Sequence, residues 1–156
     1  MRSTTETAAL TREIVIAAAP ETVWQHLVDP DKVARWMGRN ISFDPRPGGE
    51  YRIEVGRGYA ASGEFVELDP PRRLVYTWGW EAVDGKENAV PPGSSTVEIE
   101  LVMEEDGTRL RLTHRDLPTT EAADSHGSGW DHYLERLVAA ATGADPGPDP
   151  WATAQM

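Results

Sequence analysis

Two histidines are placed where an imidazole could do acid–base chemistry. His114 alternates with Leu110 and Leu112, so the three side chains share one face of a predicted strand. His126 precedes Trp130 by four residues in a predicted helix, which puts both on the inward stripe. A neutral imidazole there can hydrogen-bond a ligand hydroxyl or carbonyl, or exchange a proton near neutral pH. The alternative is that both rings only bond backbone or water at the rim of the core.

Aromatic side chains form the second set of candidates. Their flat faces suit an apolar ligand, and a Tyr O–H or Trp N–H group can orient it. An ordinary core also uses aromatics at alternating strand positions, so this alternative stays open. Trp24 and Trp130 are assigned to structural packing, and no residue is assigned a catalytic role. The candidates for lining a ligand cavity are Trp36, Tyr51, Tyr76, Trp78 and Trp80.

Other chemistries lack their motifs. There is no cysteine, which excludes disulfides, thiolate metal sites and a cysteine nucleophile. His126 and His132 face different sides of their helix and no H-E-x-x-H pattern occurs, so we expect no metal. His26 and His132 are expected at the surface. Gly48-Gly49 and Gly56-x-Gly58 are assigned to turns rather than to a phosphate loop, and no G-x-S-x-G elbow is present, so no cofactor is predicted.

Hydrophobic periodicity predicts the elements that position these residues. Alternation predicts a strand over 12–18, followed by two short helices that are separated at Asp29-Pro30. About six further strands are predicted between residues 41 and 114, with Asp106-Gly107 as a hairpin signal. The inward face of strand 59–68 stays open, because a bulge there would change its register.

The chain is predicted to end in one long helix. Apolar residues from Trp130 to Ala141 fall at helical spacing on a single stripe. Residues 1–10 and 143–156 lack apolar periodicity and are expected to be flexible, which leaves 11–142 as one folded domain. The sequence assigns no role to Trp151 in the tail.

This order of elements predicts a pocket. One antiparallel run of strands with a helix at its end favours an α+β fold with helices on one face of a curled sheet. Thr120 to Gly129 is small and polar, so the N-terminal half of the helix should leave space beneath it. An empty void of ~300 Å³ would cost roughly 7 kcal/mol at about 24 cal/mol per Å³. Such a hollow persists only if water, a ligand or partial collapse relieves it.

The net charge limits the kinds of partner that the protein can bind. Fifteen Lys and Arg against 26 Asp and Glu give a formal charge of −11, and the longest basic run is Arg72-Arg73. Phosphate backbones and anionic lipid surfaces would be repelled, so neither a nucleic acid nor a membrane is expected as a partner. No apolar stretch is long enough to span a bilayer. We expect a cytoplasmic protein, either a monomer or a homodimer.

Five ordered patterns resemble a known family. From Thr11 to Ala141 the chain is similar to the START-like (SRPBCC) superfamily, in the branch that resembles the C-terminal domain of heat-shock-protein-90 ATPase activators. The patterns are Ala19-Pro20-Glu21-Thr22-Val23-Trp24, Asp29-Pro30 with Arg35-Trp36, Gly48-Gly49, the run from Gly63 to Trp78, and His126-x-x-Gly129-Trp130-x-x-x-Leu134-x-x-Leu137.

The resemblance implies a fold and three alternative functions. The implied fold is a helix-grip, in which a curved seven-stranded antiparallel sheet wraps around a long C-terminal helix and an internal cavity. Members of the superfamily bind apolar small molecules, act as aromatase/cyclases or contact the chaperone. Our first hypothesis is a carrier or sensor of an apolar or aromatic ligand. The alternatives are a cyclase or hydrolase that uses His114 or His126, and a module that binds the chaperone and activates its ATPase.

Overall fold

The computed structural model describes residues 7–56, 59–83, 85–86, 88–147 and 149–150. Within these residues the chain forms an α+β fold, and no helix is long and apolar enough to cross a membrane. The strands are β1 (Ala8–Ile16), β2 (Arg39–Phe43), β3 (Glu50–Gly56), β4 (Tyr59–Asp69), β5 (Arg73–Trp78), β6 (Ser95–Glu104) and β7 (Gly107–Leu117). The helices are α1 (Pro20–Val28), α2 (Pro30–Val33) and α3 (Thr120–Ala141).

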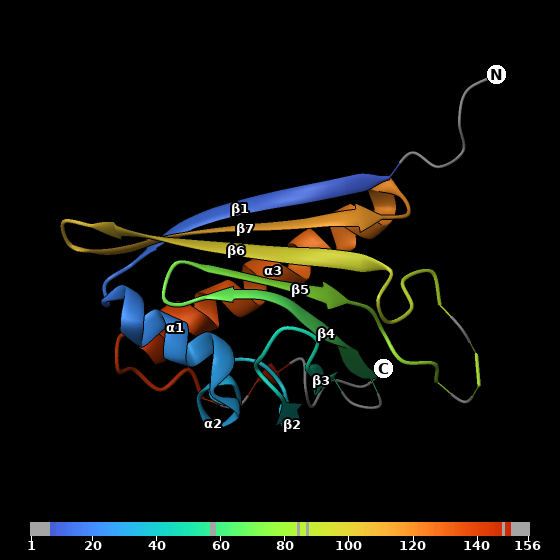
Figure 1. Ribbon diagram of the computed structural model, residues 1–156, viewed down its shortest axis with the longest axis horizontal. Coiled ribbons are helices and arrows are strands. Elements are labelled where there is room, and N and C mark those ends of the chain that lie inside the picture. Colours follow the sequence, from blue (N-terminus) through green and yellow to red (C-terminus); the bar gives the residue numbers. More distant parts are fainter. Residues whose placement is uncertain (1–6, 57–58, 84, 87, 148, 151–156) are drawn as a thin grey trace.

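The strands form one antiparallel sheet of seven strands, and α3 lies across one of its faces (Figure 1). The spatial order is β1-β7-β6-β5-β4-β3-β2, so the two short helices between β1 and β2 span the sheet from one edge to the other. This arrangement confirms the predicted sheet, the long final helix and the two short helices after the first strand.

Alternation along the central strands builds the core. On β6, Val97, Ile99 and Leu101 are buried while the intervening residues are more exposed, and on β7 Leu110 and Leu112 are fully buried. These apolar residues of β6 and β7 belong to the same hydrophobic core as the buried stripe of α3. That stripe consists of Ala123, Gly127, Trp130, Tyr133, Leu134, Leu137, Ala140 and Ala141.

Two structural features hold α3 in place. Thr119 caps its first turn by accepting a hydrogen bond from the Ala122 N–H at 3.0 Å. Gly127 allows a close approach to β1, because a Cβ there would lie 2.5 Å from Nη2 of Arg12. The Arg12 guanidinium in turn bonds Asp131 on the same helix, with Nε to Oδ1 at 2.6 Å. The helix is therefore fixed to the sheet edge one turn away from His126.

The first strand is longer than predicted, and the structure defines the register of β4 and contacts of the segment after α3. The first strand begins at Ala8 because it continues its pairing with β7 as far as Leu117. On β4 the register shifts between Phe65 and Glu67, which turns Phe65 inward and leaves Val66 50% exposed. In the tail, Arg136 donates to the carbonyls of Pro146 and Gly147, so part of the segment expected to be flexible contacts α3. Residues 1–6 and Trp151 lie outside the described residues.

Candidate functional site

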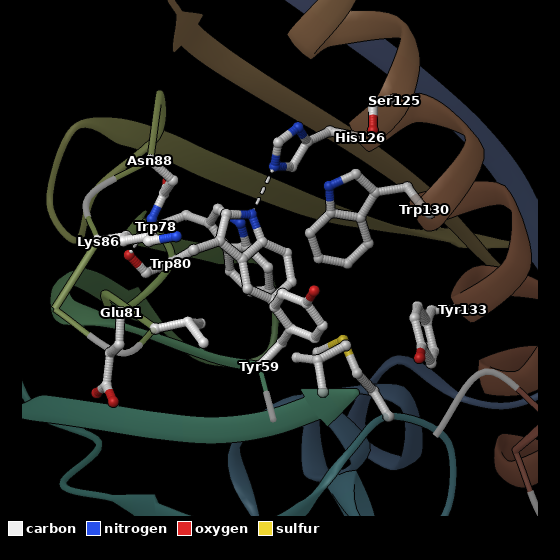
Figure 2. Close-up of a pocket in the computed structure, with 14 residues that line it drawn as sticks. Tyr59, Trp78, Trp80, Glu81, Lys86, Asn88, Ser125, His126, Trp130 and Tyr133 are labelled. Carbon is white, nitrogen blue, oxygen red and sulfur yellow. Dashed lines mark hydrogen bonds between the residues drawn. The ribbon is translucent and has the colours of Figure 1, made fainter. Parts of the chain in front are cut away.

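A cavity of about 740 Å³ lies between the middle of α3 and the end of the sheet where β5 stops (Figure 2). Ligand pockets in proteins have volumes of roughly 300–1,000 Å³, so a drug-sized molecule fits. The helix contributes Ser125, His126 and Gly129 from the half under which space is predicted, and Trp130 and Tyr133 from its apolar stripe. The apolar wall consists of Met37, Val55, Trp78, Trp80, Trp130 and Tyr133.

The mouth of the cavity is formed by the loop after β5 and the start of β4. Val83 and Lys86 on the loop and Tyr59 on β4 line the cavity and are exposed. The loop is folded back on itself, because the backbone N–H of Trp80 donates to the Val90 carbonyl at 2.7 Å. The cavity is thus open to solvent at the end where charged and hydroxyl groups lie.

His126 is a neutral imidazole held between the helix backbone and an indole. Its Nδ1 lies 2.8 Å from the Ala122 carbonyl, which can only accept, so Nδ1 carries the proton. Its Nε2 lies 3.0 Å from Nε1 of Trp80, which can only donate, so Nε2 is the acceptor. This bond joins α3 to the loop after β5 across the cavity wall (Figure 2).

His114 is fixed in the opposite tautomer behind the wall. Its Nδ1 accepts from the Trp130 indole N–H at 3.1 Å. Its Nε2 lies 2.8 Å from Oγ of Ser95, and that hydroxyl donates to the Trp78 carbonyl at 2.9 Å, so Nε2 carries the proton and donates to Ser95. His114 is fully buried and does not line the cavity directly.

Burial lowers the pKa of both imidazoles. For His114 the loss of solvation, with a smaller contribution from the charge of His126, lowers the pKa to about 3. For His126 burial lowers the pKa, while the hydrogen bond to the Ala122 carbonyl opposes this in part. The two rings lie 5.1 Å apart, edge to face. Both are therefore neutral at physiological pH, and protonation of either would turn an N–H group against an indole N–H.

The structure separates the predicted lining residues into two groups. Trp78, Trp80 and His126 line the cavity, and His114 supports it through Trp130. The remaining three residues, Trp36, Tyr51 and Tyr76, do not line this cavity; they border a space of about 20 Å³ in the aromatic core, which is room for one water at most.

Those three core aromatics are held by their own contacts. Trp36 donates to the His26 carbonyl at 2.7 Å, Tyr51 donates to the Thr77 carbonyl, and Tyr76 packs edge to face on Tyr51. Burial raises the pKa of both tyrosines. Tyr51 also borders a polar hollow of about 500 Å³, separate from the main cavity.

Two expectations from the sequence are wrong, and one is incomplete. Trp130 packs in the core as expected and also lines the cavity. His26 is only 5% exposed, because it turns toward its own helix and bonds the Thr22 carbonyl at 2.8 Å. His132 is partly buried, because its Nε2 lies 2.9 Å from Oδ1 of Asp149 in the tail.

Sequence reasoning missed Ser95 and the residues of the mouth. Ser95 is 1% exposed and has the same strand parity as the inward-facing Val97, so parity would have indicated a buried polar residue. Tyr59 begins β4 and Lys86 lies in the loop after β5, and no periodic pattern in the sequence reports whether such residues line a cavity.

The described residues contain no group of three or more His, Cys, Asp or Glu side chains placed to hold a metal ion. One indole donor has no partner: Nε1 of Trp78 is buried without a hydrogen bond. What the site offers a ligand is mainly aromatic surface.

A curved antiparallel sheet that grips a long C-terminal helix beside a cavity defines the chain as a START-like helix-grip domain. Residues 17–142 match the family model described as Activator of Hsp90 ATPase homolog 1-like protein, and the chain belongs to this AHSA1 family. No curated protein gives a significant match.

Solved structures agree with this assignment. An AHSA1-like protein from Rhizobium etli is 44% identical, with a TM-score of 0.73, and the match covers 99% of this chain and 94% of that one. CalU16 from Micromonospora echinospora is 28% identical, with a TM-score of 0.65, over 88% of this chain and 76% of its own. DynU16, from the dynemicin biosynthetic locus, shares the fold at 22% identity and a TM-score of 0.77; the match covers 92% of this chain and half of DynU16.

Proposed function

We propose that the protein binds an apolar, aromatic small molecule in the cavity beneath α3, as a carrier or sensor. The observation that carries this proposal is the cavity of about 740 Å³ with three indoles in its wall. Transfer of an aromatic molecule from water into such a space removes apolar surface from water at roughly 25 cal/mol per Å². Ring faces that meet edge to face or offset add to this gain.

The hydrogen bonds of the wall support binding over acid–base catalysis. Both nitrogens of His114 are engaged with Trp130 and Ser95, and both nitrogens of His126 are engaged with Trp80 and a backbone carbonyl. A general base needs an available lone pair within hydrogen-bond reach of the substrate. The imidazoles instead fix the angles at which two indoles present their faces to the cavity.

Gly129 offers a direct test. It lines the cavity, and a Cβ added there would meet no atom within 4 Å. We therefore expect Gly129→Leu to fold normally and to fill part of the cavity. The matched control is Ser128→Leu, which adds the same side chain at the exposed neighbouring position of the helix.

The measurement is thermal unfolding with and without naphthalene-type probes, together with native mass spectrometry of freshly purified protein. A binder is stabilised by about 2.7 kcal/mol at a hundredfold excess over Kd. Wild type and Ser128→Leu should show this stabilisation, and Gly129→Leu should not. Equal stabilisation of all three proteins, or of none, would contradict binding in this cavity.

One further variant and one further assay distinguish the two alternatives. A cyclase or hydrolase should lose turnover, but not ligand binding, in His126→Asn. A chaperone-binding module should stimulate the chaperone ATPase equally well as wild type and as Gly129→Leu, because the cavity would play no part.

A further inference from the structure

The polar groups of the cavity are distributed unevenly between its interior and its mouth. Inside, the N–H groups of Trp80 and Trp130 are taken by the two imidazoles, and Nε1 of Trp78 is buried. Apart from Nε1 of Trp78, which is buried without a partner, the interior therefore offers ring faces rather than hydrogen bonds. The buried part of a ligand should be a flat ring system without polar substituents, because an unpaired polar group there would cost about 1–3 kcal/mol.

The mouth, in contrast, carries a cationic side chain. Lys86 lines the cavity, and Figure 2 shows its side chain directed from the loop toward the indoles. It forms no ion pair with any described residue. The lining carboxylate, Glu81, is already held by Arg52, whose Nε lies 3.0 and 3.1 Å from its two oxygens. The amide of Asn88 is also occupied, with Nδ2 on the Trp80 carbonyl and Oδ1 on the Val90 N–H.

Among the described residues, Lys86 is therefore the charged group of the lining whose side chain has no partner, and a hydroxyl lies in the same lining. Tyr59 is 40% exposed, and Figure 2 shows its ring turned into the cavity. An ammonium and a phenolic O–H in the lining of one aromatic cavity are donors that suit an anionic oxygen.

We propose that the ligand is an aromatic carboxylate, with its rings among the indoles and its carboxylate at the mouth against the Lys86 ammonium. This inference rests on the proposed function and names the ligand class of the same cavity. The net charge of −11 would repel an anion from most of the surface, so Lys86 supplies the local attraction that admits one.

The test compares two probes of the same shape, 2-naphthoate and the neutral 2-naphthamide, titrated by tryptophan fluorescence in low salt. We expect wild type to bind naphthoate roughly three- to tenfold more tightly than naphthamide, as a partly exposed charge pair allows. Lys86→Gln should remove this preference without weakening naphthamide binding by more than about twofold, and Lys86→Arg should retain it. Added salt should reduce it as well.

The chain provides its own control. Its only other lysine is Lys32, which lies on α2 outside the cavity lining, so Lys32→Gln makes the same change of charge elsewhere. Equal affinity for the two probes, or a preference that survives in Lys86→Gln, overturns the aromatic carboxylate while naphthamide binding still supports the proposed function. Binding of neither probe overturns both.

Discussion

The indole N–H groups that donate to the two imidazoles oppose protonation of the nitrogens that accept them. Nδ1 of His114 accepts from an indole N–H of α3, and Nε2 donates to a serine hydroxyl of β6, so neither nitrogen is bonded to a carboxylate. The other titratable group nearby is His126, which is itself neutral. Removal of the His114 ring would leave the Trp130 indole N–H without an acceptor, so these rings are structural parts of the cavity wall.

Stability should therefore depend on pH through His114. Its pKa is about 3 in the folded state and about 6.5 when unfolded. The unfolded chain consequently binds more protons between these values, and the free energy of unfolding should fall as the pH drops below about 6.5. Between these two pKa values, His114 alone changes the free energy of unfolding by about 1.4 kcal/mol per pH unit. Urea unfolding at about pH 7.5 and about pH 5.5 measures the effect.

His114→Gln is the informative variant for this prediction. Its amide can still accept from Trp130 and donate to Ser95 but does not titrate in this range. The variant should be less stable than wild type at about pH 7.5, yet lose less stability on acidification. An unchanged pH dependence would show that His114 does not titrate as its surroundings require.

At the scale of the elements, α3 carries two glycines with opposite surroundings. Gly127 faces Arg12 of β1, whereas Gly129 faces open space in the cavity. Replacement of a helical glycine by alanine gains about 0.5–1 kcal/mol of helix propensity. Gly129→Ala should show this gain in full, while Gly127→Ala should show less, because its Cβ displaces the Arg12–Asp131 pair. Urea unfolding of the two variants compares them directly, and equal gains would contradict the close approach of α3 to β1.

The elements also show what a sequence can and cannot reveal. Alternation on β6 and β7 predicts the inward residues, because one face of each strand packs on the helix. The same rule puts Tyr76, Trp78 and Trp80 on one face of the chain, and it cannot say which of them meet a cavity. Tyr76 closes against Tyr51 and Phe65, whereas Trp78 lies beyond them at the end of β5, where the neighbouring side chains leave space.

The mouth is the part of the site that sequence patterns leave undetermined. Trp80, Lys86 and Asn88 come from one loop whose shape is set by bonds such as Asn88 Nδ2 to the Trp80 carbonyl at 2.9 Å. Such bonds connect residues without any period, so only the folded structure brings a lysine and three indoles to one cavity.

At the scale of the whole molecule, Asp149 in the segment after α3 bonds the helix that covers the cavity. Asp149 accepts the Tyr133 hydroxyl at 2.6 Å and lies 2.9 Å from His132, and its side chain is 8% exposed. Tyr133 lines the cavity, and burial together with Asp149 raises its pKa. The tail therefore supports the outer side of the wall against which we expect a ligand to pack.

Asp149→Ala tests this connection. The change leaves the buried Tyr133 hydroxyl and the His132 ring without their carboxylate, so we expect the free energy of unfolding to fall by about 1–3 kcal/mol. The control is Asp145→Ala, which removes an exposed carboxylate that bonds the nearby Gly147 N–H and should cost less than about 0.5 kcal/mol. Because Tyr133 belongs to the cavity wall, Asp149→Ala should also weaken naphthamide binding, measured by the same fluorescence titration. If Asp149→Ala behaves like Asp145→Ala in both measurements, the tail does not support the cavity.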